Sequence, residues 1–203
     1  MESNNKVILV GEIGEEFIFD HSSHGEDFYR SFLKIERKSG YTDKIPFVIS
    51  KKIIDVRHNL IGLRVKIEGQ FRSYNKYEGD KNILVLYVFV DMIKESEEDF
   101  QNVVELYGFI CKYCNLRNVK TRDVSDVLLA VNRRNRKSDY IPCLAWNRNA
   151  QMASILDVGT RLSIKGRIQS REYIKRISED EIQTKTAYEV SISELEVIDD
   201  EKI

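Results

Sequence analysis

The stretch Gly62-Leu-Arg-Val-Lys-Ile-Glu-Gly-Gln-Phe-Arg-Ser73 returns 97 positions later as Gly159-Thr-Arg-Leu-Ser-Ile-Lys-Gly-Arg-Ile-Gln-Ser170. The same separation relates Leu9-Val-Gly-Glu-Ile13 to Leu106-Tyr-Gly-Phe-Ile110, and a separation of 96 relates 32–46 to 128–142. A period this long exceeds that of solenoid repeats and predicts two tandem copies of one domain. We expect the first domain over 1–97 and the second over 98–203, with an acidic boundary stretch at 95–102.

Each copy is expected to contain five short strands with one helix between the third and fourth. The expected strands are 7–13, 28–37, 45–49, 64–73 and 83–92 in the first copy, and 104–110, 124–133, 141–146, 161–171 and 186–197 in the second. Ser50 and Asn147 are the expected helix caps, and Met152, Ile155 and Leu156 the packed helix face, with Gly159 ending the helix. This element order predicts a mostly-β chain of two tandem OB-fold barrels.

The composition is that of a soluble globular protein, with 203 residues of which 42% are hydrophobic and 32% are charged. The apolar runs are far shorter than the roughly 20 residues that cross a bilayer, and no signal peptide is expected at the N-terminus. Three cysteines are too few for a disulfide scaffold and suit a reducing compartment. We therefore expect a cytoplasmic protein with no membrane partner.

The net charge of −1 hides a separation of charges along the chain. Residues 30–76 carry twelve basic and four acidic side chains, and residues 101–176 carry fifteen basic and six acidic ones. The intervening and terminal segments are acidic. Such basic blocks predict a face in each copy that binds a polyanion.

Alternation along the fourth strands separates a core face from an exposed face. In the second copy Leu162, Ile164 and Ile168 are expected to point inward. The exposed faces would then carry Lys165, Arg167, Arg171 and Tyr173 in the second copy, and Arg72, Tyr74 and Lys76 in the first. An ordinary solvated barrel wall is the alternative interpretation.

Aromatic side chains of the third strand fall beside a basic turn. Tyr140 and Trp146 share one face of this strand, and their basic neighbours are Arg133, Arg134, Arg136, Lys137 and Arg148. Bases stack on rings while phosphates contact cations, so this pattern is typical of single-stranded nucleic-acid binding. The alternative is that Trp146 closes the barrel end as part of the core.

These motifs resemble the bacterial single-stranded DNA-binding protein family. The resemblance covers 103–199 and, more weakly through the repeat, 6–94; it is carried by 128–133, 138–142, Ala145-Trp-Asn-Arg148, Ile164-Lys-Gly-Arg167, Arg171-Glu-Tyr173 and Tyr188-Glu-Val190. It implies base stacking at Tyr140, Trp146 and Tyr173. At the equivalent positions the first copy has Lys44, Ser50 and Lys76, so the stacking rings are absent. It keeps cations that could contact phosphates, namely Arg37, Lys38, Lys44, Arg72 and Lys76. Tyr41, Tyr74 and Tyr77 are weaker substitutes for the missing rings.

The resemblance also carries expectations about assembly. The chain ends soon after its last expected strand, without the acidic tail of the family's replicative members. This ending favours an accessory, plasmid-borne or phage-type relative, or a relative of the primosomal replication protein N. Because the family assembles four OB domains, the resemblance implies a homodimer, with replication proteins as further partners.

Other chemistry has little support in the sequence. Cys111 and Cys114 have the spacing of half a zinc site, but no second close pair exists. His21 and His24 are expected in an acidic surface turn. No phosphate-binding glycine loop or catalytic cluster occurs. We therefore expect neither an enzyme nor a cofactor.

Two functions remain open from the sequence. The preferred one is non-catalytic binding of single-stranded DNA in replication, recombination or repair, with RNA as a further candidate ligand. The alternative is a protein-interaction scaffold of a primosome-like or mobile-element replication complex with little affinity for DNA.

Overall fold

The computed structural model describes residues 3–79, 81–176 and 182–198, and this part of the chain consists mainly of β-strands with one short helix. The strands of the first copy are β1 (Asn5–Ile13), β2 (Ile18–Ser23), β3 (Glu26–Glu36), β4 (Thr42–Ser50), β5 (Arg64–Glu78) and β6 (Lys81–Glu95). Those of the second are β7 (Gln101–Ile110), β8 (Leu116–Val119), β9 (Arg122–Asn132), β10 (Ser138–Trp146), β11 (Arg161–Arg176) and β12 (Ile182–Val197), with helix α1 (Arg148–Ser154) between β10 and β11.

Each copy closes into a five-stranded barrel. In the first, β1 pairs with both β3 and β5, while β4 and β6 pair in parallel and complete the circuit. The second repeats this arrangement, with β7 paired with β9 and β11, and β10 parallel to β12. The predicted pair of tandem OB-fold barrels is therefore confirmed.

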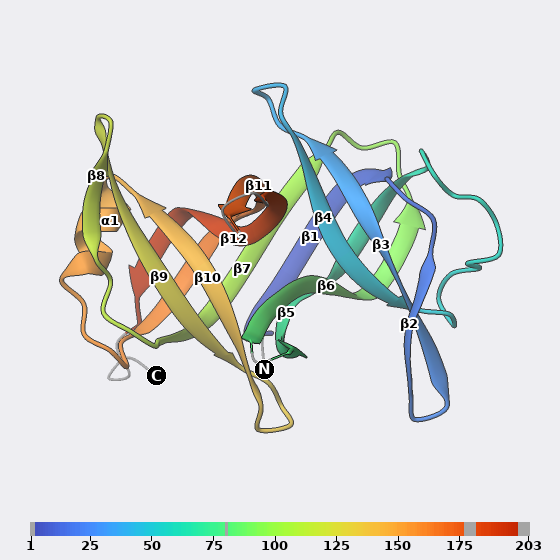
Figure 1. Cartoon of the computed structure of the whole chain (residues 1–203), viewed down its shortest axis with the longest axis horizontal. Helices are drawn as coiled ribbons and strands as arrows, with labels where there is room; N and C mark the ends of the chain where they lie inside the picture. The colour runs from blue at the N-terminus through green and yellow to red at the C-terminus, as the bar shows by residue number, and fades with distance from the viewer. Residues whose placement is uncertain (1–2, 80, 177–181, 199–203) are drawn as a thin grey trace.

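The two barrels share one continuous twelve-stranded sheet, because β1 and β7 pair antiparallel from Asn5↔Leu106 to Val10↔Gln101. The barrels consequently lie side by side along the long axis of the molecule (Figure 1). The Asn5 amide also exchanges two hydrogen bonds with the backbone of Phe71, and Asn102 does the same with Ile168. The copies are thus related by an approximate two-fold axis.

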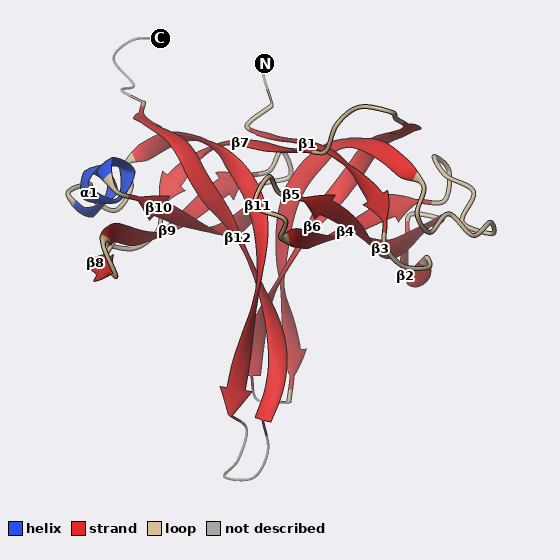
Figure 2. Ribbon diagram, turned by 90° about the horizontal axis from the view of Figure 1, so that it is seen from above, coloured by secondary structure: helices blue, strands red, loops and turns tan. Residues whose placement is uncertain are grey.

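Two long hairpins extend beyond the barrels. The β5–β6 and β11–β12 hairpins project together from between the barrels, on the side opposite to both termini (Figure 2). We call the part of these hairpins beyond Ser73 and Ser170 the stem. The strands exceed the predicted lengths because pairing continues to Glu78↔Lys81 and Arg176↔Ile182, outside the cores.

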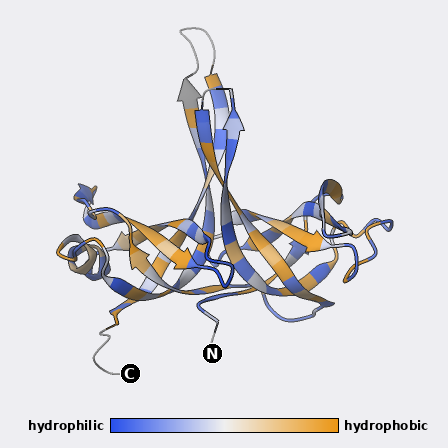
Figure 3. Cartoon of the chain, turned by 90° about the horizontal axis from the view of Figure 1, so that it is seen from below, coloured by the Kyte–Doolittle hydropathy of each residue, from blue (hydrophilic) through white to orange (hydrophobic). Residues whose placement is uncertain are grey.

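Alternation along the strands supplies both cores. Hydrophobic and hydrophilic residues alternate along the strands of both barrels (Figure 3). Leu162, Ile164 and Ile168 are buried as predicted, and in the first barrel Phe47 and Phe71 are the largest fully buried side chains. Gly166 and its counterpart Gly69 lie at β-bulges, where a Cβ atom would overlap a carbonyl oxygen of the paired strand.

The helix predicted in the first copy is wrong, because residues 51–62 form a series of turns. Local side-chain bonds compete with the helix there. Asp55 accepts a hydrogen bond from the backbone N–H of Arg57, and Asn59 accepts one from that of Ile61 (3.0 Å). Asx turns of this kind divert the backbone from helical bonding.

The second-copy helix exists, but its details differ from the prediction. Asn147 has φ 49° and makes no side-chain cap; its N–H instead donates to the Asp123 carbonyl. The helix ends at Ser154, so Ile155 turns outward and is 81% exposed, whereas Met152 and Leu156 pack on the core as predicted. In the described residues, no helix is both long enough and apolar enough to cross a membrane.

Candidate nucleic-acid interface

A buried aspartate fixes the second copy against the hairpin of the first. Asp139 on β10 accepts hydrogen bonds from Arg133 (Nε–Oδ2 2.7 Å) and from the backbone N–H of Ser73 on β5 (2.6 Å). The Tyr140 N–H donates to Ser73 Oγ at 2.8 Å. The start of β10 is therefore held at the root of the β5–β6 hairpin, which belongs to the other copy.

The same contact recurs in the opposite direction. Asp43 on β4 accepts from Arg37 (Nε–Oδ2 2.6 Å) and from the backbone N–H of Ser170 on β11 (2.8 Å). The Lys44 N–H donates to Ser170 Oγ at 3.2 Å, and the Tyr41 hydroxyl to the Ser170 carbonyl at 3.3 Å. We call these two sets the aspartate latches. Hydrogen bonding to the aspartate raises the pKa of Arg37, and likewise the pKa of Arg133.

The Asp139 latch borders a groove on the outside of the first barrel that neither copy forms alone. Its volume is about 1130 Å³. The first copy supplies its floor from β2, β3, β4 and the β5–β6 hairpin. The second copy supplies Arg133 and Lys137 from the β9–β10 turn, Ser138 and Tyr140 from β10, and Thr186 and Tyr188 from β12. We call this the composite groove.

Four tyrosines line the composite groove. The rings of Tyr74 and Tyr87 meet edge to face with centroids 5.9 Å apart, and Tyr140 is exposed in the same groove. Burial, reinforced by the nearby Glu15, raises the pKa of Tyr188 to about 12, and burial also raises the pKa of Tyr87. Both half-buried phenols therefore stay neutral near pH 7, and the four rings together offer surfaces on which bases can stack.

Cations accompany these rings. Arg30 and Lys137 lie in the composite groove with exposed side chains, and Lys76 pairs there with Glu78 (Nζ–Oε1 2.9 Å). Exposed ion pairs contribute little energy, so Lys76 can exchange this partner for a phosphate at low cost. Arg133 is a different case, because Asp139 and the Ser73 carbonyl already occupy its guanidinium.

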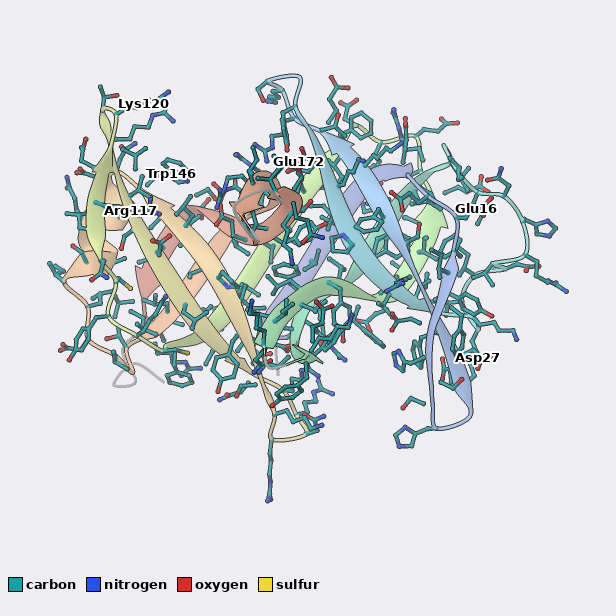
Figure 4. The ribbon with its side chains drawn as sticks, in the orientation of Figure 1. Glu16, Asp27, Arg117, Lys120, Trp146 and Glu172 are labelled. Carbon is teal, nitrogen blue, oxygen red and sulfur yellow. The ribbon has the colours of Figure 1, made fainter. Side chains whose placement is uncertain are left out.

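Trp146 lies on the second barrel, outside the composite groove. Its indole N–H donates to Ser191 Oγ at 3.1 Å, and the side chain is half-buried. Strand register places Trp146 opposite Val124, and Val124 opposite Arg117. Directly opposite residues share a face, so Trp146 and Arg117 belong to one row, beside the hairpin that carries Lys120 (Figure 4).

The root of the β11–β12 hairpin carries a further exposed ring. Tyr173 is exposed, with the Arg171 guanidinium 6.0 Å from its ring centroid. The latch brings Tyr41 and Lys44 of the first copy against Ser170, next to Arg171. We call this set, together with Trp146 and Arg117, the tryptophan face.

The structure thus divides the predicted second-copy platform. Tyr140, Lys137, Tyr74 and Lys76 meet in the composite groove, whereas Trp146 and Tyr173 are not among its lining residues. Lys44 lies against the second copy, just as Tyr140 lies against the first. The division follows from the latches, because each β-turn crosses to the neighbouring barrel.

The remaining predicted residues are spread more widely. Lys38, Arg134, Arg136 and Arg148 are exposed on turns or at the start of α1. Arg72 lies 4.2 Å from the Phe89 ring centroid, and Lys165 pairs with Glu105 at 3.8 Å. Arg167 is exposed overall, although burial and the neighbouring Arg37 lower the pKa of its guanidinium.

Sequence reasoning missed Tyr87, Tyr188, Arg30 and Arg117. The first two lie on the fifth strand of each copy, and that strand received no assignment to a face. One signal was available, since the aspartate and serine of each latch recur at equivalent positions in the repeat. Within the described residues the cysteines are free thiols, and no three metal-binding side chains cluster.

Two closed barrels with rings and cations on their outer faces define the class as a tandem OB-fold protein. Residues 101–198 match the model of the single-strand binding protein family. The match spans the second barrel, from the start of β7 to the end of β12.

Solved structures are similar over almost the whole chain. The wild-type single-stranded DNA binding protein from Thermus aquaticus is 22% identical with a TM-score of 0.69, and the match covers 98% of this chain and 95% of that one. A deletion mutant of it gives the same identity and TM-score, covering 96% and 94%. At this identity the likeness shows the fold alone.

A third structure matches only part of the chain. The N-terminal domain of PriB from Thermoanaerobacter tencongensis is 39% identical over 47% of this chain and all of that one. Its TM-score of 0.41 is too low for the match to bear on the fold. No curated protein matches the chain.

Proposed function

We propose that this protein binds single-stranded DNA without catalysis, using base stacking and phosphate neutralisation. The observation that carries the proposal is the composite groove, in which four tyrosines and three available cations from both copies face one open volume. Each stacked base contributes roughly 1–3 kcal/mol, so two or three stacked bases give useful affinity without sequence preference.

In this proposal the first barrel is a full binding surface, although it lacks the family's stacking residues. Tyr74 and Tyr87 supply rings from the first copy, and Tyr140 adds one from the second. Arg30, Lys76 and Lys137 meet the phosphates. The chain therefore replaces a family motif with rings gathered from both copies.

The tryptophan face is the second surface for the same strand. Trp146 and Tyr173 would each stack a base, while Arg171 and Lys44 neutralise phosphates. Arg117 would exchange its exposed partner Asp126 (2.9 Å) for a phosphate. The indole N–H of Trp146 donates to the Ser191 hydroxyl, and this hydrogen bond restrains the ring before the base binds. A fixed ring loses less rotamer entropy on binding than a free one.

The wider assignments belong to the same proposal. We propose domains at 1–97 and 98–203, a homodimer that presents four barrels, and a role in DNA replication, recombination or repair. Cytoplasmic location fits these roles. The exposed cations Lys38, Arg134, Arg136, Arg148, Lys165 and Arg167 would guide the strand through long-range attraction.

Fluorescence anisotropy of a labelled oligo-dT tests the composite groove. We expect Tyr74→Ala and Tyr140→Ala each to weaken binding roughly 5- to 100-fold, because each removes a stacking ring. Tyr113→Ala is the matched control, since Tyr113 is exposed outside the groove and its loss should leave affinity unchanged.

The same titration separates the alternatives. Absence of oligo-dT binding at low salt would reject the proposal and favour the protein-interaction scaffold. If Tyr74→Ala, Tyr140→Ala and the control Tyr113→Ala all lose the same affinity, DNA does not bind in the composite groove. A parallel titration with oligo-rU measures whether the surface distinguishes the two sugars.

A further inference from the structure

The twelve-stranded sheet ends in two edge strands. Among the described residues, β2 pairs with β3 alone and β8 pairs with β9 alone, so each leaves one edge without a partner strand. Edge strands present unpaired N–H and C=O groups that can pair with a strand from another chain. Each end of the molecule therefore offers a backbone docking edge.

Both edges carry exposed apolar side chains. Ile18 and Phe19 on β2 are each 53% exposed, and Leu116 and Val119 on β8 are 47% and 42% exposed. β-Strand addition combines main-chain bonds with side-chain contacts of this type. Side chains alternate along a strand, so each edge has an apolar side chain on either face that a docked strand can contact.

The two ends have opposite charge. Residues 15–27, around β2, contain five acidic side chains, of which Glu26 and Asp27 pair with Lys52 and Lys51, so this end carries a charge of −3. Residues 112–122, around β8, contain four basic side chains, and β9 adds Asp123 and the Arg117 partner Asp126, so this end carries a charge of +2. Figure 4 shows Glu16 and Asp27 at one end of the molecule, and Arg117 and Lys120 at the other. Because of the internal repeat, β2 and β8 are equivalent edge strands, and they differ in the sign of the charge around them.

We propose that the β2 edge of one chain docks on the β8 edge of a second copy. The occupant is another copy of this chain because the required surface, a short free edge with apolar side chains and the opposite charge, is present on the molecule itself. Pairing of like ends would bring two acidic or two basic hairpins together, and this repulsion selects β2 against β8.

This contact is heterologous, since the two docking edges are different surfaces. The edges lie at opposite ends of the long axis (Figure 1), so each docked chain leaves a free β8 at one end and a free β2 at the other. A heterologous contact that does not close produces an open row of molecules. Neighbours in such a row would bind a long single strand cooperatively.

Sedimentation velocity of the full chain without DNA tests the proposal. At about 0.02 M salt we expect the mean mass to rise with protein concentration, and at about 0.5 M salt to return to a constant value, because salt screens the end charges. This readout is independent of DNA binding, so it can fail while the proposed function holds.

Charge-reversed variants make the test specific. With these neighbours counted, Glu16→Lys with Asp27→Lys changes the β2 end from −3 to +1 and gives a chain with two basic ends. Lys120→Glu with Arg122→Glu changes the β8 end from +2 to −2 and gives a chain with two acidic ends. Neither variant should form the row alone, whereas an equimolar mixture of the two should recover it. Recovery also shows that both variants are folded. The control Lys6→Glu with Lys94→Glu makes the same charge change as the second variant, on exposed residues of β1 and β6, and should associate like the wild type.

Three results would overturn the proposal. They are a constant mass at low salt, association that survives both end reversals, and a mixture that fails to recover while each variant keeps the wild-type circular dichroism spectrum.

Discussion

At the scale of single residues, ring exposure decides which aromatic side chains can meet a base. Tyr140 and Tyr173 are exposed, whereas Trp146 is half-buried and tied to Ser191 through its N–H. Trp146 therefore has a packing role and a partly exposed ring. These roles can be separated by choosing which part of the side chain is replaced.

Replacement of Trp146 by Phe and by Leu distinguishes stacking from packing. Phe keeps an aromatic face but loses the bond to Ser191, so we expect oligo-dT affinity to fall only a few-fold. Leu removes the ring, and affinity should fall by roughly 1–3 kcal/mol. Anisotropy measures the affinities, and thermal unfolding checks stability. Equal affinity of the two variants would show that no base stacks at this position.

Tyr188 gives a pH prediction with a defined sign. An unfolded chain ionises tyrosine near pH 10, whereas the folded protein keeps this proton until about pH 12. Its contribution to the free energy of unfolding is present below about pH 10 and is lost as pH rises towards 12. We expect Tyr188→Phe to reduce this alkaline loss of stability in denaturant titrations at pH 9 and pH 11. If Tyr188→Phe loses as much stability as the wild type between pH 9 and pH 11, the ionisation of Tyr188 is not the cause of the loss.

At the scale of elements, strand parity and the repeat predict more than local helix signals do. The five barrel strands of each copy were predicted, because alternation records burial directly. The first-copy helix was predicted wrongly, since Asp55 and Asn59 bond to nearby backbone instead. The composite groove could not be predicted, because it depends on which barrel each β-turn crosses to, and single-sequence periodicity carries no such information.

The aspartate latch is the element that assembles the groove. Asp139→Ala removes the partner of a partly buried Arg133 and of the Ser73 N–H, so we expect a loss of about 3 kcal/mol in the free energy of unfolding. Asp139→Asn keeps an oxygen for the Ser73 N–H and should lose less. Urea denaturation measures both. If Ala and Asn cost the same, the interbarrel hydrogen bond contributes nothing.

At the scale of the whole molecule, the approximate two-fold axis joins two copies of nearly equal net charge, −1 for 1–97 and 0 for 98–203, whose outer ends nevertheless differ in charge. Both copies still share the plan of a barrel, a latch and a hairpin. The net charge is nearly zero, yet the cations gather on the composite groove, the tryptophan face and the turns beside them. Binding of a polyanion should therefore depend on these local surfaces rather than on total charge.

Salt titration measures how many phosphates those surfaces contact. Each contact to a single strand contributes a slope of about −0.7 to the plot of log affinity against log salt, so about six contacts predict a slope near −4. Lys137→Ala should make the slope shallower by about 0.7. A slope near zero would contradict phosphate neutralisation.

Photo-cross-linking of the full chain to an oligonucleotide that carries 5-iododeoxyuridine tests the central claim most directly. Peptide mapping should find cross-links at Tyr74, Tyr87 or Tyr140 in the composite groove, and at Trp146 or Tyr173 on the tryptophan face. Cross-links confined to one barrel, or to neither surface, would contradict a binding surface that both copies build together.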